Sequence, residues 1–304
     1  MTIAKLQTRP ATLIIRRADH DVMNAVWRYQ CMTALQVTKL LFSVNSLTWV
    51  QTKLKRLAET GYLVRTEVPV RLVGGRSTLY YGLGERGLAH LAYHGVDVPE
   101  RARPYRIRGY SDLFIHHLLA VNEVLIAGHL VCQQYPTLKL ARSLHQQDFE
   151  REPVPVRRPG GQQTKVKFDG FLDFEVHTAE PYRSPLCLEV DRGTERRQKW
   201  REKVKSLVYF MRGPYQERFA RKAITIGIVA TPGRSRLASL IGWTREELTE
   251  LKATPEETAA FRFATFPLDG RTRESARPTP AEVFLAPRWY PAFDSKPVPL
   301  FSGI

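Results

Sequence analysis

The sequence contains little cysteine and no long apolar run. Only three of its 304 residues are cysteines, at scattered positions, so buried thiols in a reducing cytoplasm are expected rather than a disulfide framework. No stretch approaches the roughly 18 consecutive apolar residues that indicate a membrane span. The apolar patch near the N-terminus is followed by arginines and lacks a small-residue cleavage site, unlike a signal peptide. The sequence therefore predicts a cytoplasmic protein with no membrane partner.

Several catalytic motifs are also missing. There is no phosphate-binding loop of the Gly-x4-Gly-Lys-Ser/Thr type, and no serine, cysteine or lysine lies in a recognisable nucleophile setting. Tyr209 falls in a predicted helix, roughly opposite Trp200, and no histidine cluster of the kind that a relaxase uses for its metal is evident. A covalent tyrosine mechanism is therefore not expected.

Positive charge is the strongest global feature. The chain has 46 lysines and arginines against 30 aspartates and glutamates, a formal net charge of +16. Residues 1–100 hold 13 basic and 7 acidic residues, which leaves 33 and 23 for residues 101–304, so a single charged tail does not explain the total. Such a surplus favours phosphate-rich partners, with nucleic acid the first candidate and an anionic membrane the second.

The first hundred residues show the element order of a winged helix-turn-helix domain, which we place at residues 19–95. Two amphipathic helical segments precede a third, whose apolar residues recur at helical spacing from Leu47 to Leu57 and which stops at Gly61. A β-run, a Gly-Gly-Arg-Ser turn, a second β-run and a further helix complete the order. A small protein-interaction module is the alternative, since the same order of elements also serves that purpose.

The third helix would enter the major groove of DNA, because polar and basic residues occupy its exposed face. The candidate DNA-binding residues, the last two of them on the wing, are Thr48, Gln51, Thr52, Lys55, Arg56, Arg71 and Arg76.

The second half predicts a three-layer α/β domain with a mixed sheet, at residues 136–270. An N-terminal arm (residues 1–18), a linking helix (residues 96–135) and a tail rich in proline and aromatic residues (residues 271–304) complete the organisation. Strands are predicted at 138–150, 165–177, 184–191, 223–231 and 259–268, an exposed basic loop at 151–164, and helices at 194–213 and 234–252. Thr194 is the expected N-cap of the first of these helices.

Three carboxylates are expected to meet at one edge of this sheet. Asp169 comes just before one strand, and Glu189 and Asp191 end the neighbouring strand, on one face because they are two residues apart. Such oxygen-rich clusters hold Mg²⁺ or Mn²⁺, with water and substrate phosphate completing the shell, so all three acids are candidate metal ligands. A cap at the start of the following helix is the alternative explanation of Glu189 and Asp191.

The helix after these acids adds cations. Arg196, Lys199 and Lys203 follow at i, i+3 and i+7, so they can approach a DNA phosphate or steady a hydroxide nucleophile. Metal-assisted phosphodiester hydrolysis requires these parts, a metal to polarise the phosphate and a cation for the developing charge.

The spacing of the acids resembles the PD-(D/E)XK nuclease pattern. Asp169 is followed after nineteen residues by Glu189-Val190-Asp191, with "FDG" in the place of the first motif. The chain departs from the pattern where Asp191 replaces the usual lysine, a role that Lys203 or Lys199 on the following helix can take. The resemblance implies a restriction-endonuclease-like fold with Asp169, Glu189, Asp191 and Lys203 as the catalytic set.

A second resemblance covers roughly residues 20–265. The winged helix together with "HHLLAVNEVLI", "FDGFLDFEV" and "LEVDRGTERRQKWREKVKSLVYF" resembles the replication–relaxation family of plasmids and integrative elements. The resemblance implies double-stranded DNA binding at mobile-element origins in the bacterial cytoplasm. It also implies that the protein is a replication or relaxosome accessory factor, whose partner is a relaxase, a replication protein or a transposition protein.

Three functions remain open at this stage. The first is a non-catalytic DNA-binding accessory factor of a mobile element, and the second is an Mg²⁺- or Mn²⁺-dependent DNA endonuclease on the same scaffold. The third is a winged-helix transcriptional regulator that uses the second domain only to form a homodimer. The first two predict opposite results in a metal-dependent cleavage assay.

Overall fold

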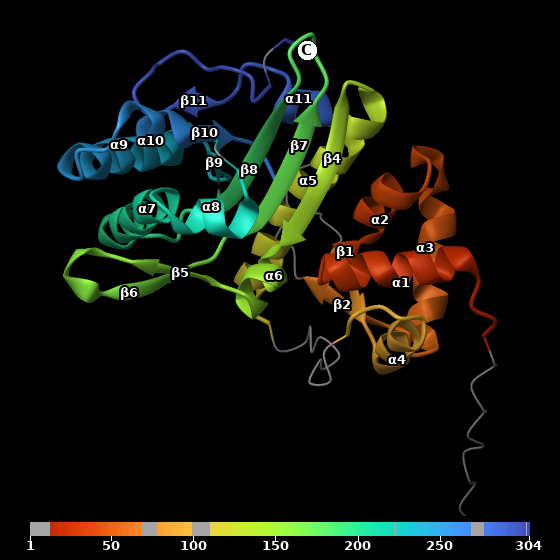
Figure 1. Ribbon diagram of the computed structural model, residues 1–304. Helices are drawn as coiled ribbons and strands as arrows, with labels where there is room; N and C mark the ends of the chain where they lie inside the picture. The colour runs from red at the N-terminus through yellow and green to blue at the C-terminus, as the bar shows by residue number, and fades with distance from the viewer. Residues whose placement is uncertain (1–12, 69–77, 99–109, 222, 269–276, 302) are drawn as a thin grey trace, which may run out of the picture. The chain divides into compact units, whose positions relative to one another are not determined.

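The computed structural model of the chain describes residues 13–68, 78–98, 110–221, 223–268, 277–301 and 303–304. The chain divides into two compact units, Met1–Leu118 and Leu119–Ile304. Together they form a mixed α+β protein, in which helices accompany a small sheet in the first unit and a mixed six-stranded sheet in the second (Figure 1).

In its described residues, the first unit combines the helices α1 to α4 with a three-stranded antiparallel sheet of order β1-β3-β2. Its elements in chain order are α1 (Arg17–Arg28), β1 (Cys31–Thr33), α2 (Ala34–Leu41), the 3₁₀ turn η1 (Val44–Ser46), α3 (Leu47–Glu59), β2 (Leu63–Val68), β3 (Thr78–Leu83) and α4 (Glu85–Tyr93). The predicted three helices, two β-runs and following helix are all present. The short strand β1, which pairs with β3, was not expected from the sequence.

Local sequence signals explain where the helices of this unit begin and end. Thr33 and Gln36 form a capping box at the start of α2, each side chain accepting a hydrogen bond from the other residue's backbone N–H. α3 buries Val50 and Leu54 completely and ends just before Gly61, whose φ of +79° suits glycine. The helical spacing and the glycine stop of the third helix are thereby confirmed.

The second unit is built on a six-stranded mixed sheet of order β11-β10-β9-β8-β7-β4, in which β8, β9 and β10 run parallel and the other neighbours are antiparallel. The strands of this sheet are β4 (Leu138–His145), β7 (Gly170–Val176), β8 (Tyr182–Asp191), β9 (Thr225–Ala230), β10 (Phe261–Thr265) and β11 (Tyr290–Pro291). A separate hairpin pairs β5 (Val154–Arg157) with β6 (Gln163–Val166) around the 3₁₀ turn η3 (Pro159–Gly161). The remaining helices are α5 (Asp112–Gln134), α6 (Gln146–Arg151), α7 (Arg197–Met211), α8 (Pro214–Phe219), α9 (Arg234–Glu250), α10 (Pro255–Ala260) and α11 (Pro280–Phe284).

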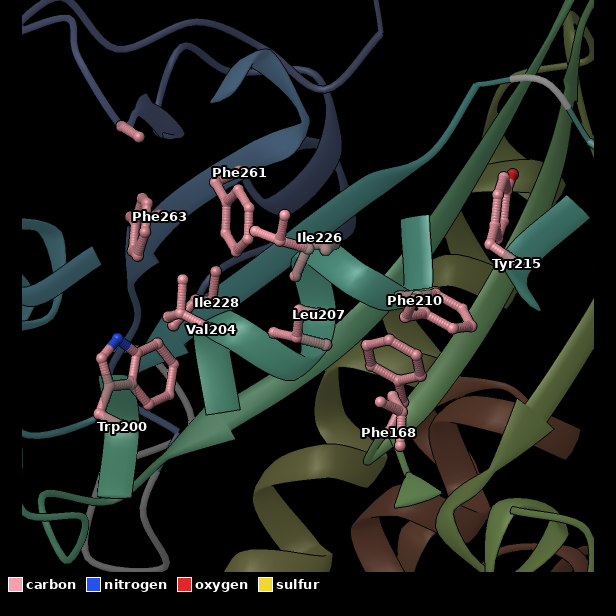
Figure 2. Packing of buried hydrophobic residues seen from close by; sticks show 14 of the residues in the cluster. Phe168, Trp200, Val204, Leu207, Phe210, Tyr215, Ile226, Ile228, Phe261 and Phe263 are labelled. Carbon is pink, nitrogen blue, oxygen red and sulfur yellow. The ribbon is translucent and has the colours of Figure 1, made fainter. Parts of the chain in front are cut away.

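One face of the six-stranded sheet carries the main hydrophobic core of this unit. Side chains of α7 pack against β9 and β10, as Figure 2 shows for the buried residues Trp200, Val204, Leu207, Ile226, Ile228, Phe261 and Phe263. Leu237 and Leu240 of α9 belong to the same cluster. Because apolar residues alternate along β9 and β10 toward this face, the buried cluster fixes which side chains of β8 face α7.

The opposite face of the sheet packs against α5 and the C-terminal segment. A side chain at Gly128 of α5 would collide with Leu172 of β7, which shows how closely the helix and the strand approach. Phe284 and Phe301 stack on each other and both contact Phe174 of β7. The aromatic residues of the C-terminal segment therefore pack on the second unit itself.

Four local predictions for this unit were wrong. The predicted loop at 151–164 contains β5, because Val154 and Val156 alternate into the core, and the predicted strand at 165–177 is split between β6 and β7 in different sheets. The strand predicted to reach residue 150 ends at His145, whose N–H is capped by the Asp148 carboxylate at the start of α6. The N-cap of α7 is Arg196 rather than Thr194.

α5 bears on the sequence prediction about membrane spans. The helix is long and apolar enough to cross a membrane by length and average composition, although 72% of its most apolar window is buried inside the structure. The prediction concerned runs of consecutive apolar residues, and α5 contains no such run, because histidines, Asn122 and Glu123 interrupt it; its mean hydropathy is nevertheless high. A mostly buried core helix passes the same test, so α5 is weak evidence for a membrane.

Candidate functional site

The exposed face of α3 borders a groove in the first unit. The groove has a volume of about 510 Å³ and is lined by Thr33, Ala34, Leu35, Leu47, Thr48, Gln51, Thr52, Lys55, Arg65, Leu79 and Tyr81. Of the nine predicted DNA-binding residues, seven belong to the first unit, and four of these, Thr48, Gln51, Thr52 and Lys55, lie together in the groove. The helical period brings them together, because Val50 and Leu54 between them turn into the core.

The polar groups in this groove differ in how much of their bonding capacity is already used. The Thr52 hydroxyl donates to the Thr48 carbonyl at 3.0 Å, so it retains its lone pairs as acceptors. Lys55 lies 3.8 Å from Glu59, and both side chains are more than half exposed, so this ion pair is weak. The Lys55 ammonium therefore remains available to an anionic partner.

Arg56 lies outside the groove and has a structural partner. Its guanidinium donates to Asp19 of α1 at 3.1 Å, and Lys53 donates to the same carboxylate oxygen at 2.6 Å. Asp19 is completely buried; burial raises its pKa, but hydrogen bonds from Lys53 and from the Arg16 N–H outweigh this and lower the pKa below its usual value. The cluster ties α1 to α3 and orients the exposed face of α3.

Three further arginines bear on the α3 groove, two of them predicted on the wing and one not predicted. Arg71 and Arg76 lie outside the described residues. Arg65 of β2, which the sequence analysis missed, lines the groove opposite α3 and is exposed. Arg65 could have been predicted from its position in an alternating β-run that follows a basic helix.

In the second unit Asp169 lies close to Glu189, where β7 begins beside the end of β8. Asp169 directly precedes Gly170, which pairs with Leu188, the neighbour of Glu189, and the charge of Asp169 acts on Glu189. The Asp169 N–H donates to the Leu188 carbonyl at 3.0 Å, and its carboxylate accepts from the Val190 N–H at 2.7 Å. Two like charges close together in a sheet destabilise it unless a cation lies beside them.

Lys203 of α7 provides that cation. Its ammonium lies 2.5 Å from one carboxylate oxygen of Glu189, whose side chain is only 2% exposed. Burial raises the pKa of Glu189 to about 8; Asp169 and Glu195 add to the rise, and Lys203 opposes it. Burial lowers the pKa of Lys203, but the three carboxylates outweigh this and hold it above its usual value. The second Glu189 oxygen, Oε1, is buried and has no hydrogen-bond partner among the residues that the structure describes.

Asp191 is held by a different partner. Arg236 of α9 donates to both of its carboxylate oxygens, at 2.7 and 2.8 Å, and the Gly193 N–H adds a third bond at 2.8 Å. Gly193 has a φ of +82°, as expected for the tight turn between β8 and α7. A metal ion at Asp191 would therefore compete with Arg236. The bond from the Gly193 N–H agrees with the turn in the alternative explanation, but Asp191 does not cap α7, whose N-cap residue is Arg196.

The remaining residues of this site lie at the start of α7. Glu195 has one buried oxygen without a partner and its other oxygen 3.2 Å from Lys199, which is 75% exposed. Arg196 is exposed at the N-cap of α7. The sequence analysis missed Glu195 and Arg236, since neither falls in the spacing of the recognised pattern.

The donor set can be tested against a divalent cation. In the described part of the chain, no group of three or more histidine, cysteine, aspartate or glutamate side chains is arranged to hold a metal. Asp169 and Glu189 are two carboxylates, and Glu189 Oε1 is an unpaired buried acceptor. Mg²⁺ commonly binds proteins through one or two carboxylates plus waters and substrate phosphates, so this pair fits an open Mg²⁺ site rather than a closed structural one.

A comparison with known families identifies the chain. A family model described as replication–relaxation matches residues 24–225, more than half of the chain, which confirms the resemblance drawn from the sequence. No curated protein and no solved structure matches the chain significantly.

Proposed function

Since the chain belongs to the replication–relaxation family, which is linked to the replication of plasmids and mobile elements, we propose that it is a double-stranded DNA-binding accessory factor of such an element. Its formal net charge of +16 supports a phosphate-rich partner. In this proposal the first unit recognises the DNA site, and the second unit contacts DNA or a replication, relaxase or transposition protein.

The order of elements in the first unit supports a winged helix-turn-helix interpretation. α2 and α3 are joined by the short turn η1, and β2 and β3 form a hairpin after α3. In such domains the second helix of the pair lies in the major groove and its N-terminal residues meet base edges. α3 would take that position.

The observation that carries the proposal is the set of polar groups in the α3 groove. Gln51 can form a bidentate contact with an adenine edge, and the hydroxyl oxygens of Thr48 and Thr52 can accept hydrogen bonds. Lys55 and Arg65 flank them with positive charge suited to phosphates. Base-reading groups bordered by cations are the arrangement that sequence-directed DNA binding requires.

The salt dependence of binding tests this proposal. Fluorescence anisotropy of a labelled duplex, titrated with the full chain at several salt concentrations, measures the slope of log affinity against log salt. Lys55→Ala should lower that slope by about 1, because one phosphate contact is lost. The matched control is Lys139→Ala, an exposed lysine on β4 of the second unit. Equal slopes for Lys55→Ala and the wild type would contradict a phosphate contact at this residue.

A metal-dependent DNA endonuclease is the second candidate, and the contacts of Lys203 favour it. Asp169 lies close to Glu189, and Lys203 from the next helix pairs with Glu189, as the resemblance to PD-(D/E)XK nucleases expects when the lysine has moved from the position of Asp191. A bound Mg²⁺ would polarise the phosphate. Asp169 and Glu189 would hold that ion, and Lys203 would steady negative charge beside it.

Incubation of supercoiled plasmid with the protein distinguishes the two candidates. The endonuclease predicts nicking with Mg²⁺ or Mn²⁺ that EDTA abolishes and that Glu189→Gln and Lys203→Met both lose. Lys139→Met, which changes an exposed lysine on β4 away from the acidic site, should retain it. Binding without cleavage under all metal conditions would leave the accessory factor and exclude the endonuclease.

A further inference from the structure

Three histidines gather on the surface of the first unit. His20 comes from α1, and His90 and His94 come from α4 and the residue that caps it. His20 Nδ1 lies 3.2 Å from His90 Nε2. The ring centroids are 4.4 Å apart for His90 and His94, and 5.3 Å apart for His20 and His94.

The packing of α1 on α4 explains this proximity. His90 and His94 are four residues apart and share one face of α4, while Leu91 on the neighbouring face is completely buried. Val22 of α1 is likewise completely buried, two residues beyond His20. Two core-forming helices thus bring the three imidazoles to one surface position, although His20 and His90 are 70 residues apart in the chain.

The spacing of the ring nitrogens suits a shared cation. Two nitrogens that each lie about 2.05 Å from a tetrahedral zinc ion are about 3.3 to 3.4 Å apart, close to the distance between His20 Nδ1 and His90 Nε2. A pair of histidines at i and i+4 on one helix face is a common zinc-binding arrangement.

We propose that His20, His90 and His94 bind a borderline transition-metal ion, Zn²⁺ foremost, which fastens the C-terminal end of α4 to α1. Imidazole nitrogens select zinc and its neighbours over Mg²⁺ and Ca²⁺. In the described residues no three such side chains already surround a common point, so binding includes a rotation of the exposed His94 side chain toward the other two rings. Water completes the fourth position.

Titration of the full chain with zinc tests this site. Protein stripped with EDTA is titrated with ZnCl₂ by calorimetry, and with Co²⁺ as a spectroscopic probe of tetrahedral coordination. The wild type should bind one Zn²⁺ saturably. Loss of an outer-shell partner alone weakens metal affinity by about 10- to 100-fold, so His90→Gln and His94→Gln should each weaken binding by at least about 10-fold.

Two controls separate this site from others in the chain. His177→Gln changes an exposed histidine of the second unit, and Glu189→Gln changes the acidic site, so neither should alter zinc binding by the histidine cluster. Circular dichroism without metal checks folding. Because His94 is exposed, His94→Gln stays informative even if His90→Gln disturbs the core. Absence of saturable zinc binding by the wild type, or unchanged binding by both cluster variants, would overturn the proposal.

Discussion

Replacing Lys203 with methionine removes the cation beside a buried carboxylate while keeping most of the apolar stem. Removing one partner of a buried ion pair costs about 3–5 kcal/mol, because the other charge is left unpaired. The Glu189 side chain is 2% exposed, but Lys203 is 31% exposed and partly screened by water. A loss near the lower end, about 3 kcal/mol of unfolding free energy, is therefore expected for Lys203→Met.

The pKa of Glu189 gives this loss a pH dependence. A carboxyl group whose pKa is higher in the folded chain favours folding below its unfolded value and loses that contribution as pH rises through the folded value. In the wild type this contribution is lost over the pH range from 4.5, the usual pKa, to about 8, the pKa of Glu189 in the folded chain. Lys203 lowers the pKa of Glu189, so without Lys203 the upper limit of this pH range is higher. One pKa unit corresponds to about 1.4 kcal/mol, so the deficit of Lys203→Met should stay below about 1 kcal/mol near pH 6 and approach about 3 kcal/mol only near pH 10, about two units above the folded pKa of Glu189.

Urea unfolding of the full chain at the two pH values measures this deficit, and hydrogen exchange in β8 identifies the transition of the second unit. Lys199→Met is the matched control, because its 75% exposed lysine pairs with Glu195 in solvent and should contribute less than about 1 kcal/mol. An equal deficit at both pH values would refute the electrostatic argument, since lost packing does not titrate.

Three further changes probe the supports of the two sites. Lys53→Met removes the 2.6 Å partner of the fully buried Asp19, which keeps its bond from Arg56, so it should destabilise the first unit by about 1.5–3 kcal/mol in thermal unfolding. Because Asp19 has a lowered pKa when folded, that loss should diminish as pH falls below about 4; a constant loss would contradict it. Gly61→Ala places a side chain at a φ of +79°, which should cost about 1–2 kcal/mol in the same assay, although its nearest neighbour lies at an ordinary 3.4 Å. Arg236→Gln removes both charged bonds to the buried Asp191, so hydrogen exchange at the Gly193 turn should accelerate; unchanged exchange would show that α9 does not hold this turn.

Much of the first unit could be predicted from the sequence because its signals are local. The helical period of α3 and the glycine at its end are read within one window, and the face carrying Gln51 and Lys55 follows from them. β1 is too short to produce a period of its own. Arg56 was placed on the exposed face correctly by the period, but its partner Asp19, on another helix, was not foreseeable.

The second unit shows the same division between local and distant signals. Lys203 was predicted as a substitute lysine because it follows Glu189 along one strand and one helix, and the two do form an ion pair. The partner of Asp191 could not be read from spacing, because Arg236 lies 45 residues away in the chain. The β5–β6 hairpin was predicted as a loop because its sequence is rich in proline and glycine, although buried residues alternate along β5. The histidine cluster is likewise invisible to spacing, because it depends on the packing of two helices distant in sequence.

The most direct test of sequence-directed DNA binding through α3 is a comparison of specific and nonspecific affinity. Duplexes selected from a random library by the full chain provide the site, and anisotropy then measures affinity for that site and for an unrelated duplex. Gln51→Ala should lose about 1–3 kcal/mol of preference for the selected site while its affinity for unrelated DNA stays unchanged. Selection of no preferred site, or a preference that survives Gln51→Ala intact, would contradict DNA reading by this face of α3.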